Sequence, residues 1–222
     1  NKSDKKSFGE KEMTKKIARI AVLVSGGGTN LQALIDAEKR GVIKNGEIVL
    51  VVSSNSQAFA VERAKREGIP FSIISKKDCG GQEIFEKKLI SEIEKNNIDI
   101  IVLAGFMCIL SPEFTRRFEK RIINVHPSLI PSFCGKGFYG LKVHEAALKK
   151  GVKVTGATVH FVNEIPDGGR IIRQKAVNVK KDDTPKTLQK RVMTQAEWVI
   201  LPEAAEEVSK AIAERKESNG YI

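Results

Sequence analysis

Residues 17–37, IARIAVLVSGGGTNLQALIDA, join an apolar run to a helical pattern through a glycine-rich turn. The run from Ile17 to Val24 is nearly continuous in apolar residues, which is typical of a strand covered on both faces of a parallel sheet. The apolar positions of residues 31–37 recur with helical spacing. The whole stretch therefore predicts a strand, a turn and a helix, which is the opening unit of an α/β fold.

The turn itself, Ser25 to Asn30, predicts an anion-binding site. Glycines let the backbone approach a ligand closely, and free N–H groups with the helix dipole favour a phosphate. The turn matches neither GxxxxGK[ST] nor GxGxxG, because Leu31 stands where the last glycine of the dinucleotide fingerprint falls. A single phosphate monoester held by Gly28, Thr29 and Asn30 is the better expectation. The alternative is a structural turn in which Thr29 or Asn30 caps the helix.

Further strands and helices alternate after this unit. The apolar patterns predict strands at 48–52, 71–74, 98–104 and from 122, and helices at 58–67 and 82–95, with another helix capped by Ser111 and carrying Pro112 at its first position. Alternation of this kind gives right-handed crossovers and a parallel sheet, whose ligands bind beyond the carboxyl ends of the strands.

The C-terminal third departs from this alternation. After a helix at 141–150, a strand at 155–162 is followed by another that ends at Val179, with too few residues between them for a crossover, so the two are expected to pair antiparallel. A last helix at 184–214, broken near Pro202, is expected to cover the sheet. The predicted fold class is α/β, with a Rossmann-like, mostly parallel central sheet flanked by helices and an antiparallel C-terminal addition.

Composition sets the class of protein. The chain has 222 residues, of which 41% are hydrophobic and 29% charged, as expected for one globular domain. That domain is assigned to residues 17–214, preceded by a disordered leader or a vector-derived remnant at 1–16, in which Met13 is a candidate natural start, and followed by a polar tail at 215–222. No apolar run is long enough to span a membrane, and the N-terminus lacks the apolar region of a secretory signal.

The cysteines indicate the cellular compartment, and the net charge bears on the class of binding partner. Cys79, Cys108 and Cys134 are odd in number and form no CxxC pair, which argues against a zinc site or a disulfide framework and favours the cytoplasm. The net charge of +11 fits either nucleic acid or small anionic substrates. Most lysines are mixed with acidic residues along expected helices, which is typical of a solvated face. Small-molecule substrates are therefore preferred over nucleic acid.

The strand that begins at Ile122 ends in an amide and an imidazole two residues apart. Asn124 and His126 point to one face of a strand, and Pro127 interrupts the pairing directly after them. This arrangement suits a reaction in which negative charge develops on an oxygen while a proton moves. The alternative is a buried strand end with a hydrogen-bonded histidine.

Three loops are candidates for the rest of a site. The apolar loop 105–110 suits a flat heterocycle, although core packing of a buried turn is the simpler interpretation. The glycine-rich loop 132–140 is a candidate mobile cover. Asp167, between Pro166 and two glycines, is either an ordinary turn residue or a carboxylate directed at His126.

Read together, five separated motifs resemble one known family: Ser25–Gln32 (SGGGTNLQ), Leu103–Met107 (LAGFM), Asn124–Leu129 (NVHPSL), Thr158–Val162 (TVHFV) and Asp167–Gly169 (DGG). They resemble the folate-dependent phosphoribosylglycinamide formyltransferases of purine biosynthesis, in the family's order and spacing from about residue 17 to 208. The resemblance implies transfer of a formyl group from 10-formyltetrahydrofolate to the amine of glycinamide ribonucleotide, with no metal.

The resemblance also implies roles for individual residues. Catalysis is assigned to Asn124, His126 and Asp167, with Asp167 favouring the cationic, donating form of His126. His160 is a supporting residue. The remaining assignments are to binding: the phosphoribosyl substrate to Gly28, Thr29, Asn30 and Glu197, and the folate to Gln82, Met107, Cys108, Ile109, Leu110 and Asn124. Cys108 and Gln82 stand where relatives commonly carry arginine, so two cationic folate contacts are expected to be missing.

Three other functions remain as alternatives. A formyltetrahydrofolate deformylase has an additional N-terminal regulatory domain. A formylase of initiator tRNA has an additional C-terminal nucleic-acid-binding domain. Neither two-domain arrangement fits the single domain that is expected here. A phosphate-binding regulatory module explains the glycine turn but gives Asn124, His126 and Asp167 no joint role. The sequence leaves a monomer and a homodimer equally open.

Overall fold

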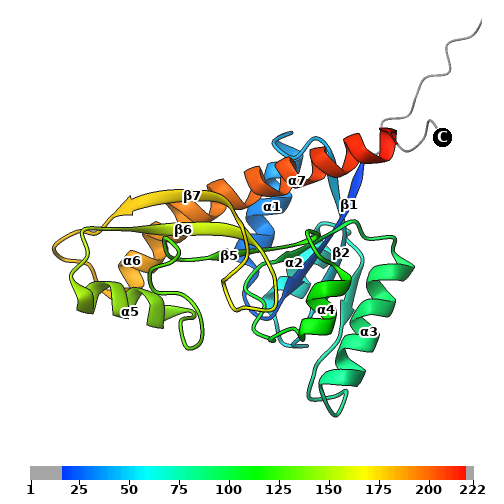
Figure 1. Cartoon of the computed structure of the whole chain (residues 1–222), viewed down its shortest axis with the longest axis horizontal. Helices are drawn as coiled ribbons and strands as arrows, with labels where there is room; N and C mark the ends of the chain where they lie inside the picture. Colours follow the sequence, from blue (N-terminus) through cyan, green and yellow to red (C-terminus); the bar gives the residue numbers. More distant parts are fainter. Residues whose placement is uncertain (1–16, 219–222) are drawn as a thin grey trace, which may run out of the picture.

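Seven strands form one mixed sheet in the order β3-β2-β1-β4-β5-β6-β7 (Figure 1). The computed structural model describes residues 17–218, so the leader expected at 1–16 and the end of the tail lie outside the described residues. Parallel pairing joins the first five strands, and β6 and β7 add antiparallel. The strands span Ala18–Val24 (β1), Gly46–Ser53 (β2), Phe71–Ile73 (β3), Ile100–Leu103 (β4), Ile122–His126 (β5), Val154–Phe161 (β6) and Ile171–Asn178 (β7).

The helices follow the predicted periodicity closely. The helices predicted at 82–95 and 141–150 are observed with those bounds, and Ser111 caps a helix that starts at Pro112 by accepting a hydrogen bond from the Phe114 N–H. The helices span Thr29–Lys39 (α1), Phe59–Arg66 (α2), Gln82–Lys95 (α3), Pro112–Arg117 (α4), Leu141–Lys150 (α5), Pro185–Val192 (α6) and Trp198–Ser218 (α7). The predicted α/β class, with its antiparallel C-terminal addition, is confirmed.

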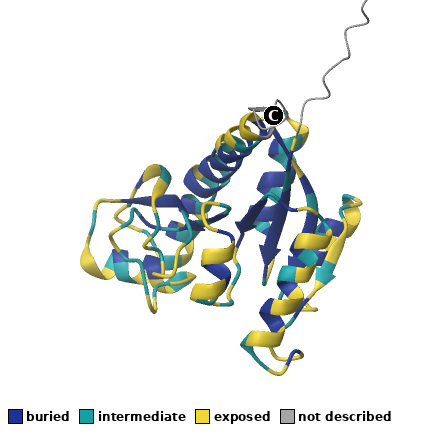
Figure 2. Cartoon of the chain, turned by 45° about the vertical axis from the view of Figure 1, so that its right-hand side comes forward, coloured by how far each residue is buried: buried dark blue, intermediate teal, exposed yellow. Residues whose placement is uncertain are grey.

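Alternate residues of the central strands pack into two separate cores. Ile20 and Val22 of β1 belong to a cluster shared with α1, α2 and α7, whereas Ala21 and Leu23 belong to a cluster shared with α3 and α4. Successive side chains of a strand point to opposite faces, so a nearly continuous apolar strand requires a cover on both sides. Figure 2 shows the central strands buried between helices whose outer faces are exposed.

The strand order places three loops at one edge of the sheet. The order reverses between β1 and β4, and ligands of open α/β sheets bind at such a reversal, beyond the carboxyl ends of the strands. The glycine turn follows β1, the apolar loop follows β4, and β5 ends at His126 beside them. Although α5 lies between β5 and β6, these two strands are antiparallel, and α5 packs against α6 instead of crossing the sheet.

One local prediction and one of the alternatives are wrong. The break in the last helical run is a π-helix at Met193–Glu197, ahead of Pro202, and α7 continues through Pro202 and beyond 214. A π-helical turn inserts one extra residue into a helix and redirects the side chains that follow it. Such turns are frequent at functional sites. Neither Thr29 nor Asn30 caps α1, because Gly28 occupies the cap position in the left-handed conformation and α1 starts at Thr29.

Gly28 is a position where only glycine fits. Its φ is 70°, and a Cβ atom there would lie 2.7 Å from Cβ of Ala60 on α2. A left-handed conformation costs a residue with a Cβ about 1–2 kcal/mol, and the contact with Ala60 adds to this cost. Gly28→Ala is therefore expected to lower the free energy of unfolding by about 2 kcal/mol or more, measured by denaturant titration.

Gly27→Ala is the matched control, because a Cβ at Gly27 would meet no atom within 4 Å. Equal denaturation midpoints for the two variants would contradict the close approach of Gly28 to α2.

Candidate active site

The glycine turn and the π-helix meet although they are far apart in the sequence. Asn30 is buried, and its side-chain N–H donates to Oε2 of Glu197 at 2.8 Å. Thr29 donates through its hydroxyl to the sulfur of Met193 at 3.4 Å. The structure thus brings together Thr29, Asn30 and Glu197, three of the four residues predicted for the phosphoribosyl substrate, and Gly28 adjoins them in the turn.

The hydrogen bond between Asn30 and Glu197 orients both side chains. One N–H of the Asn30 side-chain amide donates to Glu197, and the backbone N–H of Asn30 at the start of α1 is a separate donor for an anion. Its Oδ1 atom is buried without a hydrogen-bond partner within residues 17–218. Burial raises the pKa of Glu197, and the hydrogen bond from Asn30 partly opposes that shift. A buried acceptor of this kind suits hydroxyl donors such as those of a ribose.

Asp167 lies between two histidines. Its Oδ2 atom is 3.5 Å from Nδ1 of His126, and its Oδ1 atom is 3.5 Å from Nε2 of His160. The backbone N–H of Gly135 also donates to Oδ2, at 2.8 Å. Burial raises the pKa of Asp167, but the contact with His160, the hydrogen bond from Gly135 and the charge of His126 outweigh it, so the pKa falls below its usual value. The carboxylate is therefore ionised at neutral pH.

The glycines after Asp167 explain how it reaches this position. A Cβ at Gly169 would lie 1.7 Å from the carbonyl oxygen of Phe161, and one at Gly168 would lie 2.6 Å from the side chain of Ile165. The loop therefore folds tightly against the end of β6 only with glycine at both positions. Asp167 itself has a φ of 55°, a conformation that is uncommon outside glycine and that concentrates at functional sites.

Both ring nitrogens of His126 face acceptors. Its Nε2 lies 2.8 Å from the carbonyl oxygen of Phe133, on the opposite side of the ring from Asp167. A carbonyl and a carboxylate can only accept, so the doubly protonated ring is the form that offers each of them a donor. His126 is also buried, so the alternative of a buried, hydrogen-bonded histidine describes its environment correctly but leaves the approach of Asp167 unexplained.

Asn124 is oriented from the neighbouring strand. It lies opposite His160 in the antiparallel pairing of β5 with β6, and its Nδ2 atom is 3.3 Å from Nε2 of His160. Nδ1 of His160 faces the carbonyl oxygen of Phe161 at 2.8 Å. The same Nε2 faces Oδ1 of Asp167 at 3.5 Å, so the amide of Asn124 and the carboxylate of Asp167 converge on one ring nitrogen of His160.

The apolar loop after β4 presents alternate residues to solvent. Met107 is 59% exposed and Ile109 80% exposed, whereas Cys108 and Leu110 pack against the core beneath α3 and α4. Core packing is therefore the wrong interpretation for Met107 and Ile109. Gln82 braces the loop by donating to the carbonyl of Ile109 at 2.9 Å. Exposed apolar side chains held on a braced loop suit the flat face of a heterocycle.

Sequence reasoning missed His144 on α5. The side chain is 1% exposed, and neither ring nitrogen has a hydrogen-bond partner among the described residues. Burial first and the charge of His126 second lower the pKa of His144 to about 4. The signal available in the sequence is its place on the inward face of the helix, beside Val143 and Ala147, both of which are buried.

This shift makes stability depend on pH. The unfolded chain binds a proton at His144 below about pH 6.5 and the folded chain only below about pH 4, so stability should rise as the pH rises between these values. A shift of this size corresponds to about 3 kcal/mol. His144→Leu is expected to flatten this part of the stability profile, measured by denaturant titration at several pH values. Parallel profiles for the wild type and the variant would show that His144 is not responsible.

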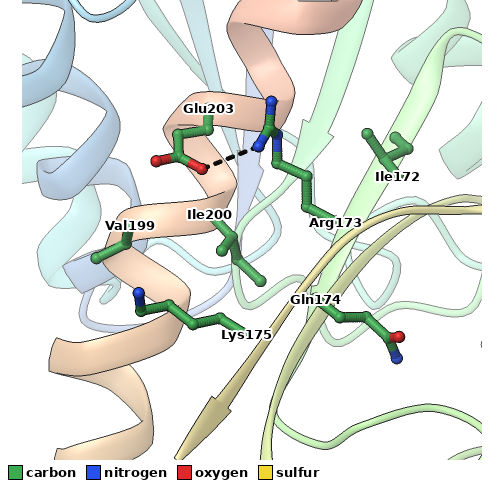
Figure 3. Close-up of a pocket in the computed structure, with 7 residues that line it drawn as sticks. All are labelled: Ile172, Arg173, Gln174, Lys175, Val199, Ile200 and Glu203. Carbon is green, nitrogen blue, oxygen red and sulfur yellow. Dashed lines mark hydrogen bonds and ion pairs between the residues drawn. The ribbon is translucent and has the colours of Figure 1, made fainter.

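A pocket of about 340 Å³ lies outside this cluster, between β7 and the first turns of α7 (Figure 3). Arg173 and Glu203 form an ion pair of 3.2 Å in its wall. None of the residues predicted for the site lines it. Among residues 17–218, no set of three or more His, Cys, Asp and Glu side chains is arranged to hold a metal ion, and no helix is long and apolar enough to cross a membrane.

Known proteins are similar to this chain in sequence and in fold. Residues 18–205 match the family described as formyl transferase. The chain is 44% identical over 208 residues to the human trifunctional purine biosynthetic protein adenosine-3, covering 94% of this chain but only 20% of that protein. It is 38% identical to a chloroplastic phosphoribosylglycinamide formyltransferase of Arabidopsis thaliana, covering 89% of this chain and 66% of the relative. The chain thus spans about a fifth of the trifunctional relative.

Two solved structures match this chain over most of its length and most of their own. Phosphoribosylglycinamide formyltransferase of Anaplasma phagocytophilum is 35% identical with a TM-score of 0.79, and glycinamide ribonucleotide transformylase 1 of Symbiobacterium toebii is 37% identical with a TM-score of 0.81. Each match covers 88% of this chain and 89% of the other. With this agreement in sequence and fold, the chain belongs to the formyl transferase family, among relatives that are phosphoribosylglycinamide formyltransferases.

Proposed function

We propose that this chain transfers the formyl group of 10-formyltetrahydrofolate to the amine of glycinamide ribonucleotide, giving formylglycinamide ribonucleotide and tetrahydrofolate in de novo purine biosynthesis. Folate-dependent formyl transfer is the known reaction of the family; the Arabidopsis thaliana relative is named for this step, and the human relative is named for purine biosynthesis. The observation that carries the proposal is the position of Asp167, 3.5 Å from both His126 and His160, at the sheet edge where β5 ends two residues after Asn124.

The two substrates are assigned to the loops that follow β1 and β4, next to this cluster. The phosphate is assigned to the N–H groups of Gly28, Thr29 and Asn30, and the ribose hydroxyls to Glu197, which is joined to Asn30. The pterin ring is assigned to the loop that exposes Met107 and Ile109. The loop and the glycine turn are in contact, because the Met107 N–H donates to the hydroxyl of Ser25 at 2.9 Å.

The chemistry is a direct acyl transfer. The substrate amine attacks the formyl carbon and forms a C–N bond, and negative charge appears on the formyl oxygen. Asn124 and cationic His126 donate hydrogen bonds to that oxygen, each worth about 3 to 4 kcal/mol where such donors have been removed. The bond from carbon to the folate nitrogen then breaks, and the proton lost by the amine reaches that nitrogen through Asp167 and a water molecule.

One contact has to change for this reaction. Nε2 of His126 donates to the Phe133 carbonyl at the start of the glycine-rich loop. Donation to the formyl oxygen requires that the carbonyl move away or share the hydrogen, so the loop at 132–140 is assigned a movement during turnover. Gly135, which donates to Asp167, lies in the same loop, and this movement would therefore affect both catalytic groups.

The deciding experiment incubates the purified chain with glycinamide ribonucleotide and 10-formyltetrahydrofolate and follows the formation of tetrahydrofolate and of the formylated nucleotide. Both products are expected in equal amounts. Tetrahydrofolate formed at the same rate without the amine substrate would identify a deformylase. An inactive wild-type chain would overturn the proposal.

The setting of the reaction is also a proposal. Three free cysteines within the described residues suit a reducing compartment such as the cytoplasm, although one relative is named chloroplastic. Small-molecule substrates are proposed, with 10-formyltetrahydrofolate as the formyl donor and without a metal, nucleic acid or membrane partner.

A further inference from the structure

Arg63 on α2 contacts the glycine turn from outside the cluster described above. Its Nε donates to the carbonyl oxygen of Gly27 at 2.8 Å, and its Nη1 donates to Oε1 of Gln32 at 3.0 Å. The guanidinium also lies 5.1 Å from the centre of the Phe59 ring. The side chain is half-buried and is held on three sides, by a carbonyl, an amide and an aromatic ring.

A second donor from α2 holds the preceding carbonyl. The Ala60 N–H donates to the carbonyl oxygen of Gly26 at 3.1 Å. In a trans peptide unit the C=O and the N–H point in opposite directions. Donors that hold the carbonyls of Gly26 and Gly27 toward α2 therefore direct the N–H groups of Gly27 and Gly28 away from α2. Successive N–H groups that point to one side form an anion-binding nest.

We infer that Arg63 is a positioning residue for the phosphate of the formyl acceptor. Its hydrogen bond to Gly27 sets the direction of the Gly28 N–H, and its charge adds to the field at the N-terminus of α1. The inference rests on the proposed function, which places a phosphate on Gly28, Thr29 and Asn30. Arg63 acts through the turn, because the two nitrogens that face it are already bonded to protein acceptors.

The geometry requires arginine at this position. Nε and Nη1 lie in one planar fork and reach two acceptors at once, which a single ammonium group does not reproduce. Gln32 is oriented for this contact, since its Nε2 donates to Asp36 at 2.9 Å and so turns its oxygen toward Arg63. Arg63→Lys keeps the charge and loses the fork, whereas Arg63→Met loses both.

Arg66 offers a matched control. Its guanidinium lies 5.5 Å from the centre of the same Phe59 ring, and the described structure gives it no hydrogen bond to the turn. Arg66→Met removes one positive charge from the same helix and the same ring. It is expected to leave kcat and both KM values within twofold of the wild type.

The test separates the two substrates. Arg63→Met is expected to raise the KM for glycinamide ribonucleotide about tenfold or more, with the KM for 10-formyltetrahydrofolate within twofold, because a hydrogen bond involving a charged group has an effect of this size. Inhibition by inorganic phosphate should weaken by the same factor. Arg63→Lys should lie between Arg63→Met and the wild type, and it replaces Arg63→Met if that variant does not fold.

The outcomes also separate this inference from the proposed function. An unchanged KM for glycinamide ribonucleotide in a folded Arg63→Met chain would overturn the role of Arg63, as would equal losses for both substrates. If the wild type catalyses no formyl transfer, calorimetric titration with inorganic phosphate still decides the matter. Phosphate binding by the wild type that is lost in Arg63→Met supports the positioning role, and equal binding by both chains overturns it.

Discussion

Asp167→Asn is expected to lower kcat by about 10³-fold or more while both KM values change by no more than a few-fold. The substitution keeps the shape of the side chain and an oxygen that can accept from the Gly135 N–H, but it removes the negative charge between His126 and His160. Both assigned roles depend on that charge, which stabilises cationic His126 and carries the proton to the leaving nitrogen. General acid–base contributions of about 10²- to 10⁴-fold are typical, and losses near 10⁴-fold follow when an orienting aspartate becomes asparagine.

Asp183→Asn is the matched control for this variant. Asp183 is another carboxylate whose pKa is lowered, chiefly by hydrogen bonds from Arg191, but it lies two residues before α6, outside the catalytic cluster. Its removal should affect stability and leave kcat unchanged. Full activity in a folded Asp167→Asn chain would remove Asp167 from the mechanism, and with it the contact on which the proposed function depends.

The sequence predicted those parts of the fold that are set by periodic burial. Continuous apolar runs such as 17–24 identified strands covered on both faces, and helical spacing gave the bounds of α3 and α5. Alternation along β5 placed Asn124 and His126 on one face. These predictions succeed because burial acts on each residue through its own element, so the pattern can be read locally.

The errors arise where a contact joins distant elements. Thr29 and Asn30 are residue types that commonly cap helices. In the structure Gly28 occupies the cap position of α1 instead, in the left-handed conformation and close to Ala60. Core packing was the simpler interpretation of the apolar loop taken alone, because hydrophobicity does not distinguish a buried side chain from one exposed beside a site, as Met107 is. Only the resemblance assigned the loop to the folate. Arg63 had no local signal, because its partners depend on packing between helices. The helical spacing around His144 indicates burial but does not show that, among the described residues, its ring has no hydrogen-bond partner.

Asn124→Ala is expected to lower kcat by about 10²- to 10³-fold, the effect of removing one preorganised donor from an oxyanion. The amide is held by His160 at 3.3 Å from the opposing strand, so the donor is in place before the charge develops. Single-turnover measurements should place the loss on the chemical step, and the affinity for glycinamide ribonucleotide should change little.

Asn124→Asp then separates electrostatics from packing. It has nearly the same shape as asparagine but presents a negative charge to the developing oxyanion, so it should be at least as inactive as Asn124→Ala. If Asn124 served only to fill space between β5 and β6, Asn124→Asp would retain more activity than Asn124→Ala, and the oxyanion would have to depend on His126 alone.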